Sequence, residues 1–60
     1  MTAEEIKPGH SYRNGEAPWR EVIAIDDAEV VYVIDGMFSL QPFRMELLAF
    51  AGWASEKKIV

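Results

Sequence analysis

Residues typical of β-strands fill the middle of the chain, where β-branched and aromatic side chains occur in short runs between turn residues. This pattern predicts four strands, over His10–Arg13, Trp19–Ile25, Val30–Ile34 and Met37–Gln41. From residue 45 the pattern changes to helix-forming residues without a β-branched side chain, which predicts a helix over Met45–Ala54. The final pair, Ile59-Val60, fits either a last short strand or a frayed end.

Turn residues separate these segments, at Asn14-Gly15, Asp26-Asp27-Ala28 and Asp35-Gly36. Glycine, asparagine and aspartate favour such positions because they tolerate positive φ or bond to their own backbone. Pro18 has no N–H group for a strand ladder, so the first loop is expected to span residues 14–18. We predict a two-residue hairpin turn at Asp35-Gly36, with Pro42 ending the strand that returns from it.

Tight turns at these positions predict the register of the strands. Ile25 is expected opposite Val30, and Val22 opposite Val33. Both faces of the meander are then apolar, whereas an ordinary antiparallel sheet has one wet face. The helix can cover one face and the first strand the other. The predicted fold is therefore mainly β (α+β), a small SH3-like barrel or antiparallel meander with a short C-terminal helix. The simpler alternative is an open three-stranded sheet with one helix.

The 60 residues allow one domain. Residues 1–6 are expected to be a flexible, charged N-terminus, and residues 7–60 a single small β-rich domain. The chain has no cysteine and one histidine, His10, so we expect no disulfide, no metal site and no cofactor. Because so short a chain has a marginal core, good packing or association with another chain is expected to supply the missing stability.

The net charge of −4 disfavours nucleic acid and anionic membranes as partners, unless the cations cluster. The first residues carry two glutamates and lack the apolar core of a signal peptide. No apolar run approaches the roughly 20 residues of a membrane span. A cytoplasmic location is the expectation that follows.

Two groups of residues are candidates for binding. Tyr12, Arg13, Trp19 and Arg20 flank the first loop, and arginine beside aromatic side chains is typical both of protein-binding hot spots and of single-stranded nucleic-acid sites. Alternatively, the two aromatic residues belong to the core and the arginines are solvated. Protein binding ranks above nucleic acid because of the acidic net charge.

The predicted helix supplies the second group. Its residues are apolar all round, and a small chain can hardly surround a helix, so one face is expected to meet another chain. Leu47, Phe50 and Ala54 are expected to face the sheet, while Met45 and Leu48 form a second stripe for the partner. Alternatively, Leu48 is an exposed surface leucine that the fold tolerates and that meets no partner.

No constellation for catalysis is apparent. Asp26 and Asp27 lie where a turn is required, and His10 has no neighbouring nucleophile and base arranged for a reaction. We therefore expect a non-catalytic protein-binding module, acting on another protein or as a homodimer. A nucleic-acid-associated regulator is the alternative.

Several short motifs resemble those of small uncharacterised bacterial and prophage proteins. The motifs are Pro8-Gly9-x-x-Tyr12-Arg13, Trp19-Arg20-x-Val22, Val30-Val31-Tyr32, Arg44-Met45 and Phe50-x-x-Trp53-Ala54. The resemblance spans residues 8–54 and implies an SH3-like barrel. It also implies a phage or mobile-element setting, with the protein as an accessory factor acting on a host protein. It implies no catalytic residues.

Overall fold

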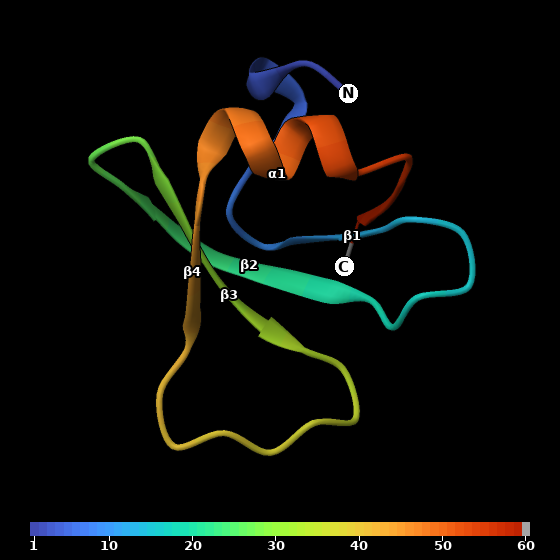
Figure 1. Cartoon of the computed structure of the whole chain (residues 1–60), viewed down its shortest axis with the longest axis vertical. Coiled ribbons are helices and arrows are strands. Elements are labelled where there is room, and N and C mark those ends of the chain that lie inside the picture. Colours follow the sequence, from blue (N-terminus) through green and yellow to red (C-terminus); the bar gives the residue numbers. More distant parts are fainter. Residues whose placement is uncertain (60) are drawn as a thin grey trace.

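In the computed structural model, which describes residues 1–59, five strands form one antiparallel sheet in the order β4-β3-β2-β1-β5 (Figure 1). The strands are β1 (His10–Arg13), β2 (Arg20–Asp26), β3 (Glu29–Ile34), β4 (Phe43–Glu46) and β5 (Glu56–Ile59). A single helical turn of the 3-10 type, η1 (Ala3–Glu5), precedes the strands, and α1 (Leu47–Trp53) lies between β4 and β5. The predicted fold class is confirmed: the chain is a mainly β meander with one short C-terminal helix, consistent with a small barrel.

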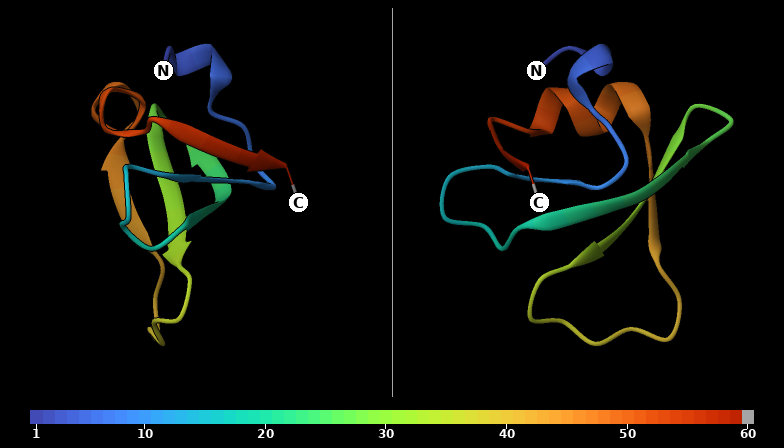
Figure 2. Two further views of the ribbon diagram at one scale, coloured as in Figure 1. Left: turned by 90° about the vertical axis from the view of Figure 1, so that its right-hand side faces the viewer. Right: turned by 180° about the vertical axis from the view of Figure 1, so that it is seen from behind.

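The sheet bends around a core that α1 and η1 cover from one end (Figure 2). Phe50 of α1 is fully buried and lies edge-on to Tyr12 of β1, with 5.7 Å between the ring centroids. Its ring also lies 5.4 Å from that of Tyr32 on β3. Aromatic contacts of this kind stabilise by about 0.5–1.5 kcal/mol beyond the area that they bury. One helix residue thus joins strands from two parts of the sheet.

A bulge in β2 decides which residues face this core. Ile25 pairs with Val30, as predicted, but the register shifts between Val22 and Ala24, so that Val22 lies opposite Tyr32. The predicted pairing of Val22 with Val33 is therefore wrong. The extra residue in a bulge shifts the side chains that follow it to the opposite face of the sheet. Val22 thus shares the face of Tyr32 and is fully buried.

The helix begins two residues later than predicted, because Met45 and Glu46 extend β4. Phe50 and Ala54 face the core, as predicted. Met45 lies in a strand and is half-buried against the core, so the predicted helical stripe of Met45 and Leu48 does not form. Within residues 1–59, none of the helical segments has the length and hydrophobicity needed to cross a bilayer.

The predicted hairpin at Asp35-Gly36 is wrong, although a turn is present. Met37 donates its N–H to the carbonyl of Ile34, 3.1 Å away, and Gly36 has a φ of +78°. However, the ladder with β2 continues past β3, because Asp35 donates to the carbonyl of Trp19 at 2.8 Å. The chain then runs as a loop over residues 35–42, and β4 starts after Pro42. Because Pro42 lies before the strand, its missing N–H removes no hydrogen bond from the ladder.

The N-terminal residues, expected to be flexible, pack against the domain. Ile6 is buried in the core, and Tyr12 holds the segment beside it. The Tyr12 hydroxyl donates to the carbonyl of Glu5 at 2.7 Å and accepts the N–H of Lys7 at 2.8 Å. Val60, part of the predicted final strand, lies outside the described residues, whereas Ile59 belongs to β5.

The turn between β2 and β3 contains two residues in the left-handed region. Asp26 pairs with Glu29, which leaves Asp27 and Ala28 as the two turn residues, with φ of 50° and 65°. Their positive φ values fit the right-handed twist of a two-residue hairpin. An alanine side chain is disfavoured there by about 1–2 kcal/mol, since its Cβ crowds the following carbonyl.

Replacing Ala28 with glycine should therefore raise the free energy of unfolding, by about 1 kcal/mol at most after the extra freedom of glycine in the unfolded chain is subtracted. Ala49→Gly is the matched control. Ala49 is exposed in α1, and there the same change should lower the free energy of unfolding by about 1 kcal/mol. Urea denaturation of both variants measures the difference, and changes of the same sign would contradict this description of the turn.

Alkaline unfolding tests the role of Tyr12. Burial raises the pKa of its phenol above the usual 10.0, although the hydrogen bond from the Lys7 N–H opposes this shift. The folded state thus favours the neutral phenol, so the stabilising contribution is complete below pH 10 and is lost as the pH rises through the folded pKa. Tyr12→Phe should cost about 1–3 kcal/mol at neutral pH by leaving the Lys7 N–H without its partner.

The same variant should also lose less stability than the wild-type chain as the pH rises above 10. Tyr32→Phe is the control, because Tyr32 is the other tyrosine of the chain. Equal slopes of stability against pH in the wild-type chain and in Tyr12→Phe would show that the buried phenol contributes nothing to alkaline unfolding.

Candidate functional site

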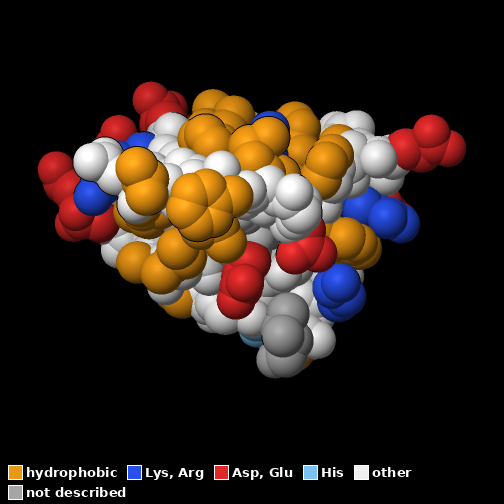
Figure 3. Space-filling view, turned by 90° about the horizontal axis from the view of Figure 1, so that it is seen from below, with side chains coloured by type: hydrophobic (Ala, Val, Ile, Leu, Met, Phe, Trp, Pro, Cys, Tyr) orange, Lys and Arg blue, Asp and Glu red, His pale blue; other side chains and the backbone are white. Residues whose placement is uncertain are grey.

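The loop between β3 and β4, residues 35–42, exposes more hydrophobic surface than any other loop in the described part of the chain. Met37 is 54% exposed, Phe38 88% and Leu40 90%. The loop extends from the end of the sheet opposite α1, and Figure 3, seen from that side, shows hydrophobic side chains gathered on this face. We call Met37, Phe38 and Leu40 the apolar loop.

Both ends of this loop are fixed to the sheet. Asp35 is bonded to β2, as described above, and Phe43 pairs with Tyr32 and stacks on its ring at 5.7 Å. Within the loop, the Ser39 hydroxyl donates to the carbonyl of Gln41 at 2.5 Å. Backbone contacts thus hold the loop, while its apolar side chains point into solvent. Side chains that are this exposed contribute nothing to the core. Contiguous exposed apolar surface usually marks an interaction site.

A second feature adjoins the start of the loop. Trp19 is half-buried beside it, and both Arg13 and Lys58 lie over the Trp19 ring, at 4.4 and 4.6 Å from its centre. Arg13 also donates from Nε to a carboxylate oxygen of Glu56, 2.7 Å away. Contacts between a cation and an aromatic face stabilise by about 0.5–1 kcal/mol at exposed sites. These contacts hold together Arg13 of β1, Lys58 of β5 and Trp19, which directly precedes β2.

Arg20 makes a similar contact with the helix. Its guanidinium lies 3.8 Å from the centre of the Trp53 ring and 5.0 Å from that of Tyr32. Met45 completes this group, since its sulfur lies 3.6 Å from an Arg20 nitrogen. The aromatic rings beside these arginines are therefore already occupied by cations of the same chain.

The structure separates the residues that the sequence suggested for binding. Arg13, Trp19, Arg20 and Met45 lie in the cation–aromatic contacts just described. Tyr12 is wholly buried. The prediction that its side chain contacts a partner is therefore wrong, and Tyr12 belongs to the core. Leu48 is 69% exposed but lies at the other end of the molecule, beside the β2–β3 turn.

Sequence reasoning missed the apolar loop because its residues were assigned to a strand. The signal was present: three hydrophobic residues lie between Gly36 and Pro42, with serine and glutamine among them. A strand of Met37–Gln41 would have buried these side chains in a hairpin. In the structure these residues are part of the loop over residues 35–42, and Phe43–Glu46 pairs with β3 in their place.

Four of the six cations contact other side chains of the same chain. Of the six, Arg13, Arg20 and Lys58 lie over aromatic rings, and Arg44 lies 3.5 Å from Asp26 and 3.2 Å from Glu29. Phosphate binding depends on cations that can exchange counterions for the nucleic-acid backbone, so these internal contacts compete with it. Within residues 1–59, no three histidine or acidic side chains group closely enough to hold a metal ion.

Comparison with known proteins identifies no relative: no protein-family model, curated protein or solved structure matches this chain. The resemblance to small bacterial and prophage proteins stays a prediction.

Proposed function

We propose that this domain is a non-catalytic protein-binding module that contacts its partner through the apolar loop. One observation carries the proposal, namely the exposure of Phe38 and Leu40, 88% and 90%, at the tip of a loop whose ends are fixed. A side chain of this size gains about 1.5–3 kcal/mol when a partner removes it from water. Since the loop ends are already ordered, binding loses less conformational freedom than it would with a flexible segment.

The cation–aromatic contacts beside the loop support the same role. The Trp19 carbonyl accepts the N–H of Asp35, the residue that starts the β3–β4 loop, and Arg13 lies over the Trp19 ring. Tryptophan and arginine are enriched in the residues that dominate protein interfaces. The apolar loop then supplies the centre of the interface and the Trp19 group its polar rim. The partner is either another protein or a second copy of this chain, and the sequence resemblance adds a phage or mobile-element setting with a host protein as partner.

A nucleic-acid-associated role is the second candidate, because arginine and tryptophan lie together at Arg13–Trp19 and Arg20–Trp53. Single-stranded nucleic acid binds to such groups when its bases stack on the rings. The cations that cover these rings, and the net charge of −4, favour the protein partner.

Removing the apolar loop should abolish association and leave the fold intact. Phe38→Ser with Leu40→Ser should change the free energy of unfolding by less than about 1 kcal/mol, because both side chains are already in water. The same double variant should weaken self-association in sedimentation velocity, or capture of a partner from nuclease-treated lysate, at least tenfold. Ile23→Ser is the control, since Ile23 is 51% exposed on β2 away from the loop.

The proposal fails if the wild-type domain stays monomeric and the double variant captures the same proteins as the wild-type domain. Capture that disappears on nuclease treatment would favour the nucleic-acid candidate instead.

A further inference from the structure

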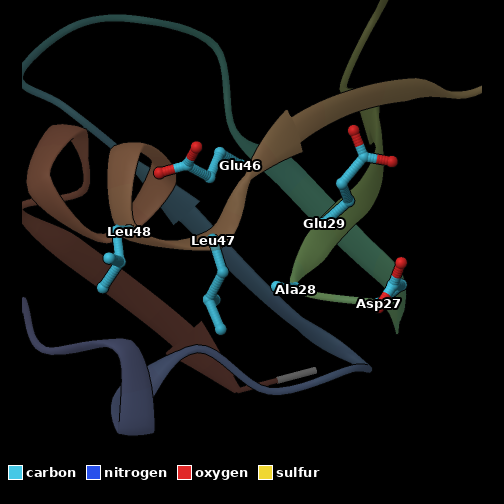
Figure 4. A pocket seen from close by; sticks show the side chains of 6 residues that line it. All are labelled: Asp27, Ala28, Glu29, Glu46, Leu47 and Leu48. Atoms are coloured by element: carbon cyan, nitrogen blue, oxygen red, sulfur yellow. The ribbon is translucent and has the colours of Figure 1, made fainter.

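A pocket of about 450 Å³ lies at the end of the molecule opposite the apolar loop. Figure 4 shows its lining, formed by Asp27, Ala28, Glu29, Glu46, Leu47 and Leu48. The first three residues belong to the β2–β3 turn and the start of β3, and the last three to the junction of β4 with α1. The pocket therefore lies between two chain segments that are far apart in sequence.

A backbone hydrogen bond holds these two segments together. Leu47 donates its N–H to the carbonyl of Ala28, 2.8 Å away. The first N–H groups of a helix have no partner within the helix, and here the β2–β3 turn supplies one. The walls of the pocket are fixed by this bond and by the pairing of β3 with β4, so a ligand meets a preformed site.

The pocket has an apolar side. Leu47 packs against the core, while Leu48 is 69% exposed, and both side chains point to the same side of the first helical turn (Figure 4). Leu48 contributes little to the core at this exposure. An apolar side chain of a partner laid against it would remove it from water.

The other part of the lining is acidic, and in Figure 4 the side chains of Glu46 and Glu29 point away from the two leucines. Asp27, Glu29 and Glu46 line the pocket, and Asp26 lies next to Asp27 in the chain. Arg44 contacts this group, near Asp26 and Glu29. Four carboxylates less one guanidinium leave a charge of about −3 here, most of the net −4 of the chain.

Arg44 pairs with Asp26 and Glu29, which leaves Asp27 and Glu46 without an ion pair among residues 1–59. Glu29 and Glu46 are directly opposite each other in the β3–β4 pairing, and like charges in that position are destabilising. The Glu46 side chain makes no capping hydrogen bond to the helix that follows. A cation from outside the domain would relieve the repulsion, and Leu48 would contact an apolar group beside that cation.

We propose that this pocket is a second docking site, which takes a basic amphipathic peptide segment, that is, a lysine or arginine side chain adjacent to an apolar one. The apolar side chain lies against Leu47 and Leu48, and the cation pairs with Glu46. The site is separate from the apolar loop, so the domain has two docking surfaces at opposite ends. Charge complementarity sets the class of partner and makes its affinity depend on salt.

A labelled hexapeptide of alternating leucine and lysine tests this site by fluorescence anisotropy. Its affinity for the wild-type domain should fall as the salt concentration rises, and a peptide of alternating leucine and glutamate should not bind. Glu46→Gln should weaken binding about fivefold, as for loss of one exposed charge pair. Leu48→Ser should weaken it about tenfold through lost apolar contact.

Glu16→Gln and Ile23→Ser are the matched controls, because they remove an exposed carboxylate and an exposed isoleucine away from the pocket. Both should bind the peptide as the wild-type domain does, and all four variants should keep the wild-type circular dichroism. Equal losses in the pocket and control variants would show that the peptide binds only through net charge and would overturn the proposal. Wild-type affinity in both Glu46→Gln and Leu48→Ser, or no binding to the wild-type domain, would also overturn it. None of these outcomes depends on whether the apolar loop has a partner.

Discussion

The contact of Phe50 with Tyr12 and Tyr32 is the interaction on which the rest of the structure depends. A chain of 60 residues without disulfides buries too little surface to spare any part of its core. Here one aromatic side chain from the helix meets two strands, while the N-terminal segment is held by the hydroxyl of the same Tyr12. The bulge in β2 belongs to this arrangement, because it turns Val22 into the core cluster that contains Phe50.

Once the core is concentrated at the helix, the two ends of the molecule differ in what they offer. At one end the loop of residues 35–42 carries exposed apolar side chains that the core does not use. At the other end the β2–β3 turn and the start of α1 enclose an acidic pocket with an apolar side. Both surfaces carry features that folding alone disfavours, exposed phenylalanine in one case and opposed glutamates in the other. Such local conflicts are expected where a protein binds a partner.

The sequence predicted the parts of this structure that depend on local pattern. The strand around His10–Arg13, the tight turn at Asp27-Ala28 and the burial of Phe50 and Ala54 follow from turn residues and periodicity. The bulge and the displaced fourth strand did not, since both depend on pairing between distant residues, that of Val22 with Tyr32 and that of Tyr32 with Phe43. For the candidate site, composition suggested Arg13 and Trp19, which contact each other in the structure while their binding role stays a prediction. The apolar loop was not suggested, because its residues were assigned to a strand.

The central claim is that hydrophobic side chains are divided between a core at α1 and a displayed loop. It is tested most directly by the same substitution at two phenylalanines, measured by urea denaturation. Phe50→Ala should cost about 3–5 kcal/mol, which unfolds most of so small a domain. Phe38→Ala should leave the free energy of unfolding within about 0.5 kcal/mol of the wild-type value. A comparable loss in both variants would contradict the account, because it would mean that Phe38 belongs to the folded core.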